Sequence, residues 1–213
     1  MGELKAPIGP NTAHLCIDMQ RLFSDEGPWP LAWMPRVTPK VEQLVARAPE
    51  RTIFTRFIPP EKPEDAPGRW RVYYEKWSHV TRRHLDHPLI GLLPVLTRYA
   101  PPATVLDKAV YSAFGNPHLH QHLQERQIDT LIISGSETDV CVLSSILAAV
   151  DYGYRIFIAE DAVCSSSDEG HDALIGLFNQ RFDIQLEPAK VEVILSAWQI
   201  LWHSCDVART LDA

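Results

Sequence analysis

Residues 130–153 read TLIISGSETDVCVLSSILAAVDYG and contain the transition that decides the fold. The opening run TLIISG is almost continuously apolar, which is typical of a strand in the middle of a parallel sheet. Residues 138–153 then place Val142, Ile146 and Ala149 on one helical face and end at a glycine. A buried strand followed directly by an amphipathic helix indicates an α/β architecture.

The same alternation continues along the rest of the chain. Strands are expected at residues 13–20, 51–58, 103–108, 130–135 and 155–162 and at the start of residues 190–201, and helices at residues 35–49, 116–127, 138–153 and 167–182 and within residues 68–85. This order predicts a doubly wound α/β fold, a Rossmann-like three-layer sandwich with a mainly parallel sheet and helices on both faces. We interpret residues 1–213 as a single domain with an insertion at about residues 59–88.

The composition argues against two classes of function. With 213 residues and a formal net charge of -7, the chain has no basic footprint for nucleic acid. No apolar run reaches the roughly 18 residues of a membrane span, and the amino terminus shows no signal-peptide pattern, so we expect a cytoplasmic protein without a membrane partner. Cys16, Cys141, Cys164 and Cys205 are far apart, which predicts reduced thiols rather than disulfides or a zinc site.

Three reactive residues are expected at the carboxyl ends of strands. Asp18 closes the first strand, Lys108 closes the third, and Cys141 lies in the first turn of the helix after the fourth. Each alone has a structural explanation, and a lone cysteine is more often a small buried side chain. Parallel sheets place their sites at this edge, however, so the three side chains are expected to meet there.

These three residue types are the equipment for acyl transfer. A helix amino terminus and a nearby lysine both favour the thiolate form of a cysteine. A carboxylate can accept the thiol proton and later pass it to a leaving amine. Free backbone N–H groups around Cys141 are suited to bind the oxyanion of a tetrahedral intermediate.

Three motifs carry a family resemblance. CIDMQ (16–20), DKAVYSAF (107–114) and SGSETDVCV (134–142) resemble the motifs of the isochorismatase-like hydrolases, in the cysteine hydrolase branch of that superfamily. The resemblance covers most of the chain, and it also matches the order of strands and helices. It therefore implies the doubly wound sheet already expected from the alternation of elements.

The resemblance also implies an activity and its residues. Asp18, Lys108 and Cys141 correspond to a catalytic triad, and a cis peptide bond is implied between Ser136 and Glu137. Ser136, Glu137 and Cys141 would together form the oxyanion hole. Because the cysteine is present, the implied reaction is hydrolysis of a C–N bond in a small amide, ureide or carbamoyl compound through a thioester intermediate.

No metal and no cofactor are expected. Nicotinamidases of this superfamily carry a metal-binding Asp-x-His motif after the second strand, whereas the corresponding residues here, FTRFIPPEKPED (54–65), contain no histidine. His118, His120 and His122 are spaced two apart on a predicted helix, so they point to different faces and are not expected to share a metal ion.

Four further side chains are candidates for the substrate pocket. Phe23 follows the first strand closely, and Tyr111 and Phe114 follow the third. Arg56 near the end of the second strand is suited to pair with a substrate carbonyl or carboxylate. Ordinary packing is the alternative for the aromatic residues, and a surface ion pair is the alternative for Arg56.

The insertion carries an aromatic helix face. Trp70, Tyr73, Tyr74 and Trp77 lie on one side of the helix expected there, which indicates either a lid over the ligand or a subunit interface. This face is the reason to expect a homo-oligomer, either a dimer or a tetramer. Glu137, beside the expected oxyanion turn, is suited to contact a substrate amino group or to bond to nearby backbone.

Two other functions remain open at this point. The first is an isochorismatase-type hydrolysis of a vinyl ether that depends on Asp18, with Cys141 as a bystander. The second is a non-catalytic binding protein that keeps the same fold. Which amide or ureide is the substrate is not fixed by the sequence, because one fold hosts many chemistries.

Overall fold

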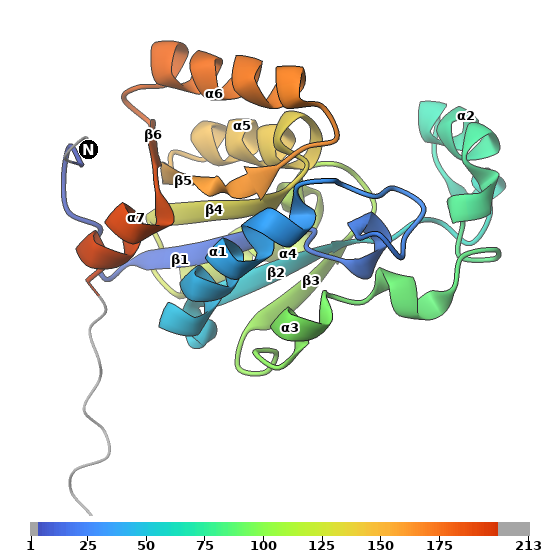
Figure 1. The fold of residues 1–213 in the computed structure, drawn as a ribbon, viewed down its shortest axis with the longest axis horizontal. Helices are drawn as coiled ribbons and strands as arrows, with labels where there is room; N and C mark the ends of the chain where they lie inside the picture. The colour runs from blue at the N-terminus through green and yellow to red at the C-terminus, as the bar shows by residue number, and fades with distance from the viewer. Residues whose placement is uncertain (1–3, 200–213) are drawn as a thin grey trace, which may run out of the picture.

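The computed structural model describes residues 4–199 and has a six-stranded sheet at its centre (Figure 1). The strands are β1 Thr12–Ile17, β2 Thr52–Phe57, β3 Thr104–Lys108, β4 Thr130–Ser136, β5 Arg155–Cys164 and β6 Leu186–Ala189. They lie in the order β3-β2-β1-β4-β5-β6, and all neighbours are parallel. The chain winds outward from β1 on one side and from β4 on the other, so the predicted doubly wound α/β fold is confirmed.

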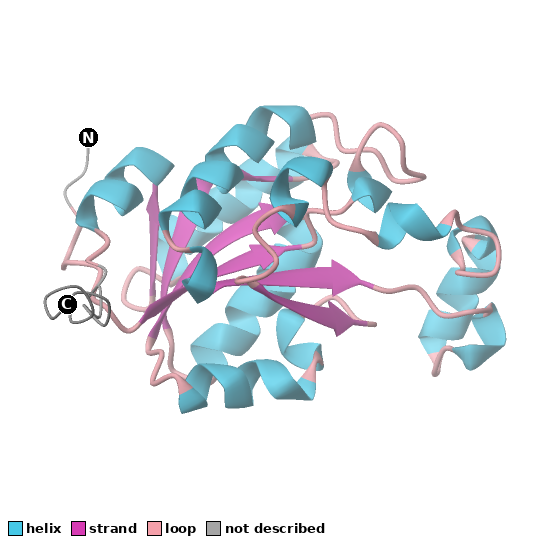
Figure 2. Ribbon diagram, turned by 90° about the horizontal axis from the view of Figure 1, so that it is seen from below, coloured by secondary structure: helices cyan, strands magenta, loops and turns pink. Residues whose placement is uncertain are grey.

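Helices cover both faces of this sheet (Figure 2). They are α1 Met34–Arg47, α2 Arg69–Lys76, α3 Pro94–Thr97, α4 Pro117–Glu125, α5 Leu143–Asp151, α6 Asp168–Arg181 and α7 Val191–Ala197. Buried residues of α1, α3 and α7 belong to the apolar core on one face, and those of α4, α5 and α6 belong to the core on the other. None of the helices in the described part of the chain is long and apolar enough to cross a membrane.

The central strands are apolar because both of their faces are covered. Every residue of β1 and β4 is buried. Side chains alternate between the two cores, so Leu15 and Ile17 pack under α4 and α5 while Cys16 packs under α1. The register pairs Ile17 with Gly135, which brings the carboxyl ends of β1 and β4 side by side. This is the point where the winding direction of the sheet changes, and such points are where α/β proteins bind ligands.

The expectation of a strand at the start of residues 190–201 is wrong. The sixth strand is instead the short edge strand β6, with the sequence LEPA, and the helix α7 begins directly after it. Val191 and Ile194 are buried three residues apart, which is helical spacing. Pro188 weakened the strand pattern of β6, although proline is compatible with an edge strand. Residues 200–201, like Cys205, lie outside the described residues.

The insertion between β2 and β3 contains the expected helix. It is α2, followed by a short 3-10 turn at Ser78–Val80. Figure 1 shows α2 standing away from the sheet, and Figure 2 shows it beyond the arrowheads of the strands. The insertion therefore stands beside the edge of the sheet at which the reactive residues were expected.

Gly135 allows β4 to approach β1 closely. Its φ of +112° lies in a region that side chains rarely adopt, and an added Cβ atom would lie 2.0 Å from the carbonyl oxygen of Ile17. That oxygen belongs to the backbone of a buried central strand, which has no room to retreat. Only glycine therefore fits at this position, directly before Ser136.

We expect Gly135→Ala to lower the free energy of unfolding by about 3 kcal/mol or more, because both the backbone strain and the clash must be relieved. Urea denaturation followed by circular dichroism measures this change. Gly176→Ala in α6 is the control, since nothing lies within 4 Å of its added Cβ. Removing a glycine from a helix interior stabilises by about 0.5–1 kcal/mol. Equal stabilities of the two variants would contradict the described β1–β4 contact.

Candidate active site

Asp18 and Lys108 form a buried ion pair at the carboxyl ends of β1 and β3. The ammonium nitrogen of Lys108 lies 2.6 Å from Oδ2 of Asp18, and both side chains are fully buried. β2 lies between these two strands, and its Thr55 contacts the carboxylate as well. The sheet topology thus brings together two residues that are far apart in the sequence.

The carboxylate of Asp18 is oriented by its neighbours. The residue adopts a φ of 51°, which aspartate tolerates better than most residues. Its backbone N–H donates to the carbonyl oxygen of Thr55 over 3.2 Å, and the Thr55 hydroxyl donates to Oδ1 over 2.7 Å. The other oxygen, Oδ2, faces the ammonium of Lys108 at 2.6 Å. The carboxylate is thus held by Thr55 at one oxygen and by Lys108 at the other.

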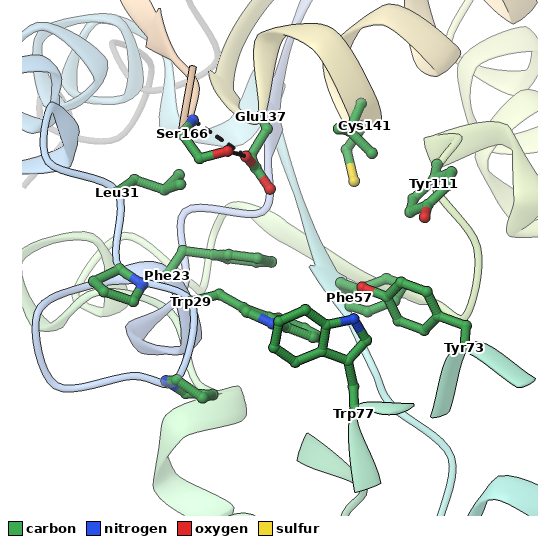
Figure 3. A pocket seen from close by; sticks show the side chains of 13 residues that line it. Phe23, Trp29, Leu31, Phe57, Tyr73, Trp77, Tyr111, Glu137, Cys141 and Ser166 are labelled. Carbon is green, nitrogen blue, oxygen red and sulfur yellow. Dashed lines mark hydrogen bonds between the residues drawn. The ribbon is translucent and has the colours of Figure 1, made fainter. Parts of the chain in front are cut away.

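Cys141 lies in the π-helical turn Thr138–Val142 that leads into α5. Its sulfur points into a pocket (Figure 3). Burial raises the pKa of the Cys141 thiol well above its ordinary value, and the carboxylate of Asp18 raises it further, while the ammonium of Lys108 lowers it. The lysine acts in the expected direction, but burial and the carboxylate together outweigh it, so the net shift of the thiol pKa is upward. The resting residue is a thiol beside a carboxylate.

Lys108 remains an ammonium despite its burial. Burial lowers the pKa of this lysine, but the negative charge of Asp18 and the proximity of Cys141 raise it more, so the net shift is upward. The ammonium also donates to the carbonyl oxygen of Val110 over 3.1 Å and lies 5.2 Å from the ring centre of Phe57. A permanent positive charge is thus fixed beside the thiol and the carboxylate.

The backbone before Cys141 has an unusual geometry. The peptide bond between Ser136 and Glu137 is cis, at the position that the resemblance implied. The hydroxyl of Ser136 donates to the carbonyl oxygen of Asp18 over 3.2 Å, which connects this turn to β1. The helical turn begins at Thr138; the amide of Val140 donates to the carbonyl oxygen of Glu137 over 3.1 Å, whereas the amides of Thr138, Asp139 and Cys141 have no acceptor among the described residues. Such amides, next to a buried thiol, are suited to bind a substrate oxygen.

A pocket of about 400 Å³ lies in front of the Cys141 sulfur. Six of its thirteen lining residues are aromatic, and the full set is Phe23, Pro28, Trp29, Pro30, Leu31, Phe57, Tyr73, Trp77, Tyr111, Glu137, Val140, Cys141 and Ser166. Two of the side chains suggested by the sequence, Phe23 and Tyr111, are among them. This volume is in the range of sites for small molecules, which is about 300–1,000 Å³.

Arg56 and Phe114 do not line this pocket. Arg56 lies directly opposite Asp107 in the β2–β3 register and forms two hydrogen bonds of 2.7 and 2.9 Å to its carboxylate. Phe114 packs instead against the rings of Tyr152 and Tyr154, at centroid distances of 5.2 and 6.0 Å. The ordinary alternatives, a surface ion pair and packing, are therefore correct for these two residues.

The aromatic face of α2 contacts its own chain. Tyr73 and Trp77 line the pocket. Trp70 packs against Tyr111 with a centroid distance of 4.7 Å, and Tyr74 is buried. Trp70, Tyr73 and Trp77 are only half-buried by these contacts, so the face is partly covered within one chain, and the homo-oligomer stays an untested prediction.

Three residues near the site were missed from the sequence. Trp29 is the central ring of the aromatic wall, within 6.4 Å of the rings of Phe23, Phe57, Tyr73 and Trp77 by centroid distance. Thr55 orients Asp18, and Ser166 holds Glu137 through its backbone N–H and hydroxyl, at 3.2 and 2.6 Å. Trp29 lies twelve residues after the end of β1, in a loop whose path no sequence pattern indicated.

The residues present do not fit a metal site. Among residues 4–199, no group of three or more histidine, cysteine, aspartate or glutamate side chains is placed to hold a metal ion. At the end of β2, the side chain that reaches the pocket is that of Phe57, which offers no ligand atom. The chemistry of the site is therefore derived from Asp18, Lys108 and Cys141 without a metal.

The chain is similar to known proteins over most of its length. Residues 12–188 match the family model described as Isochorismatase domain. The solved structure of a cysteine hydrolase from Pseudomonas syringae pv. phaseolicola superposes with a TM-score of 0.76 at 25% identity, covering 93% of this chain and 99% of that chain. A nicotinamidase/pyrazinamidase, PncA from Bacillus subtilis, superposes with a TM-score of 0.61 at 25% identity, covering 82% and 98% of the two chains.

A curated relative matches over a shorter stretch. An uncharacterized isochorismatase family protein, PncA of Bacillus subtilis (strain 168), is 39% identical over 82 residues. The aligned stretch is 38% of this chain and 45% of the relative, so it spans less than half of that relative's length. The family assignment therefore depends on the family model, whose match covers β1 to β6.

Proposed function

This chain belongs to the isochorismatase family, and on that basis we propose that it is a cysteine-dependent hydrolase of a C–N bond in a small amide, ureide or carbamoyl compound. The observation that carries the proposal is the buried Asp18–Lys108 pair beside the thiol of Cys141, whose side chain lines a small-molecule pocket. A carboxylate, an ammonium and a thiol in this arrangement supply a base, a fixed positive charge and a nucleophile. The expected location is the cytoplasm.

The first step is an attack on the amide carbon. Oδ2 of Asp18 takes the proton of the Cys141 thiol as the sulfur bonds to the carbonyl carbon, and the carbonyl oxygen becomes an oxyanion. Backbone amides of the turn after Ser136, including that of Cys141, stabilise this charge. The ammonium of Lys108 stabilises the developing negative charge on sulfur.

The second half of the reaction returns the enzyme to its resting state. The tetrahedral intermediate collapses to a thioester on Cys141 as the C–N bond breaks, and Asp18 gives its proton to the leaving nitrogen, which departs as ammonia or an amine. Water then attacks the thioester with Asp18 as base, which releases the acid and restores the thiol. The raised pKa of the Cys141 thiol agrees with this scheme, because the proton is removed only as the bond forms.

An ammonia-release screen over small amides, ureides and carbamoyl compounds tests the proposal. We expect at least one substrate to be hydrolysed, and intact-protein mass spectrometry of acid-quenched enzyme to show the added mass of its acyl group. Peptide mapping should place that group on Cys141. Turnover of an amide with no acyl adduct, and with none trapped by hydroxylamine, would contradict the covalent mechanism.

A further inference from the structure

The pocket in front of Cys141 is walled by aromatic rings from four separate segments. Figure 3 shows these rings around the hollow into which the Cys141 sulfur points. They are Phe23 and Trp29 after β1, Phe57 at the end of β2, Tyr73 and Trp77 of the α2 region, and Tyr111 after β3. The rings also support one another, as Phe23 stacks on Trp29 and Trp77 meets Trp29 edge-on, with centroid distances of 6.0 and 5.9 Å. The wall is therefore a connected set of rings rather than scattered aromatic residues.

The pocket wall carries a single formal charge. Among the described residues that line it, Glu137 is the only charged one, and no lysine or arginine is present. One oxygen of Glu137 accepts both hydrogen bonds from Ser166, and the other points into the pocket (Figure 3). The ammonium of Lys108, which does not line the pocket, is neutralised by the carboxylate of Asp18 at 2.6 Å. The wall thus presents one fixed negative charge and no positive one to a ligand.

This combination distinguishes between classes of substrate. The faces of tryptophan, tyrosine and phenylalanine attract cations, and the attraction is stronger in a site that excludes water. Glu137 adds a direct electrostatic attraction. A substrate carboxylate, by contrast, would find no partner on the wall and would be repelled by Glu137. Carbamoyl compounds that carry a carboxylate are therefore poor candidates for this site.

We propose that the substrate is a small amide whose other end carries a positive charge, an alkylammonium group held between the aromatic wall and Glu137. This inference depends on the proposed amide hydrolysis, because the reacting amide must lie at Cys141 while the cation lies against the wall. Tyr73 and Tyr111 keep the wall neutral: burial raises the pKa of each phenol, and each stays protonated at neutral pH. Glu137 then determines which substrate charge is preferred, and the aromatic rings determine which substrate shape fits.

A pair of isosteric amides tests the preference for a cation. Trimethylglycinamide carries a trimethylammonium group, and 3,3-dimethylbutanamide has a neutral tert-butyl group of the same shape. After division by the alkaline hydrolysis rates of the two amides, which corrects for activation of the carbonyl by the α-ammonium group, we expect kcat/KM for the cationic amide to exceed that for the neutral amide by about 30-fold or more, since cation–π contacts and an opposed charge act together. A ratio of one or less, or faster hydrolysis of benzamide than of the cationic amide, overturns the proposal.

Variants of the wall identify the residues responsible. Glu137→Gln keeps an acceptor for Ser166 and is expected to lower the ratio of the two kcat/KM values about tenfold. Trp77→Leu, which removes one ring, is expected to lower the same ratio by about threefold or more. Glu192→Gln, an exposed residue of α7, is the matched control and leaves the ratio unchanged. An unchanged ratio in both wall variants contradicts the assigned roles.

Binding measurements separate this inference from the proposed activity. Isothermal titration calorimetry is done with choline and with its neutral isostere 3,3-dimethylbutan-1-ol, and neither compound needs to be hydrolysed. We expect choline to bind at least about tenfold more tightly, and Glu137→Gln to remove most of the difference. Selective choline binding without hydrolysis of any amide leaves the pocket inference standing and defeats the proposed hydrolase. Amide hydrolysis together with equal binding of choline and 3,3-dimethylbutan-1-ol supports the proposed hydrolase and contradicts the proposed preference for a cation.

Discussion

Cys141→Ala is expected to lower kcat/KM for every amide that the enzyme hydrolyses by roughly 10⁴-fold or more. The variant keeps the Asp18–Lys108 pair and the aromatic pocket but has no atom that can form the thioester. Loss of a nucleophile removes the covalent route, while oxyanion stabilisation and substrate binding leave a small residual rate. Initial rates of ammonia release with purified variant, at substrate concentrations well below KM, measure the effect.

Cys164→Ala is the matched control for this experiment. Cys164 is also a buried, free cysteine at a strand end, and burial raises the pKa of its thiol to about 12. It does not line the pocket, so its replacement should change kcat/KM by less than about threefold. Equal activities of wild type and Cys141→Ala would remove the cysteine from the mechanism.

Cys141→Ser distinguishes the amidase from the vinyl-ether hydrolase considered from the sequence. A serine hydroxyl is far less acidic than a thiol, so the amide reaction should fall nearly as far as in the alanine variant. A vinyl ether cleaved through Asp18 alone needs no nucleophilic side chain, so that activity would survive. Full vinyl-ether hydrolysis by the serine variant, with no amide turnover in wild type, would favour the alternative.

Lys108→Met is expected to lower the free energy of unfolding by about 3–5 kcal/mol, the second largest effect. Lys108 and Asp18 are both fully buried, so removing the ammonium leaves a carboxylate that has lost its water and its partner. The hydroxyl of Thr55 alone does not compensate such a charge. Urea denaturation at pH 7, followed by tryptophan fluorescence, measures the loss.

A double-mutant cycle isolates the ion pair from the packing of the lysine stem. Asp18→Asn alone leaves a buried ammonium, whereas Asp18→Asn with Lys108→Met leaves neither charge. The double variant should therefore be more stable than the sum of the single losses predicts, by about 2 kcal/mol or more. Arg71→Ala, which removes an exposed pair to Glu75 in α2, should change stability by less than about 0.5 kcal/mol. Strict additivity at Asp18 and Lys108 would contradict the buried pair.

The alternation of apolar runs was enough to predict which residues meet at one edge of the sheet, at the carboxyl ends of the strands. Asp18, Lys108 and Cys141 each lie at or directly after the carboxyl end of a strand, and a parallel sheet brings such ends to one edge. The lowering of the Cys141 pKa by Lys108 was predicted correctly, but the net upward shift was not, because it depends on burial, and burial follows from the path of the surrounding loops.

Residues outside the strand ends were predicted less well. Arg56 was assigned to the pocket because it lies near a strand end, but the register sets it opposite Asp107 on the neighbouring strand. Trp29 was missed because its place in the wall depends on the path of the loop after β1, which is held by contacts such as the hydrogen bond from its N–H to the carbonyl oxygen of Leu22. Neither register nor loop path follows from periodicity.

The reacting groups and the aromatic wall are attached to different parts of the molecule. Asp18 and Lys108 are fixed by the hydrogen-bonded frame of the sheet, while Trp29, Tyr73 and Trp77 belong to connecting segments. The loops and helices that connect strands tolerate substitutions, insertions and deletions far better than buried strands do. Replacing the β2–β3 connection with an unrelated sequence is therefore a route to new substrate preferences in an enzyme whose bond-breaking atoms keep their positions.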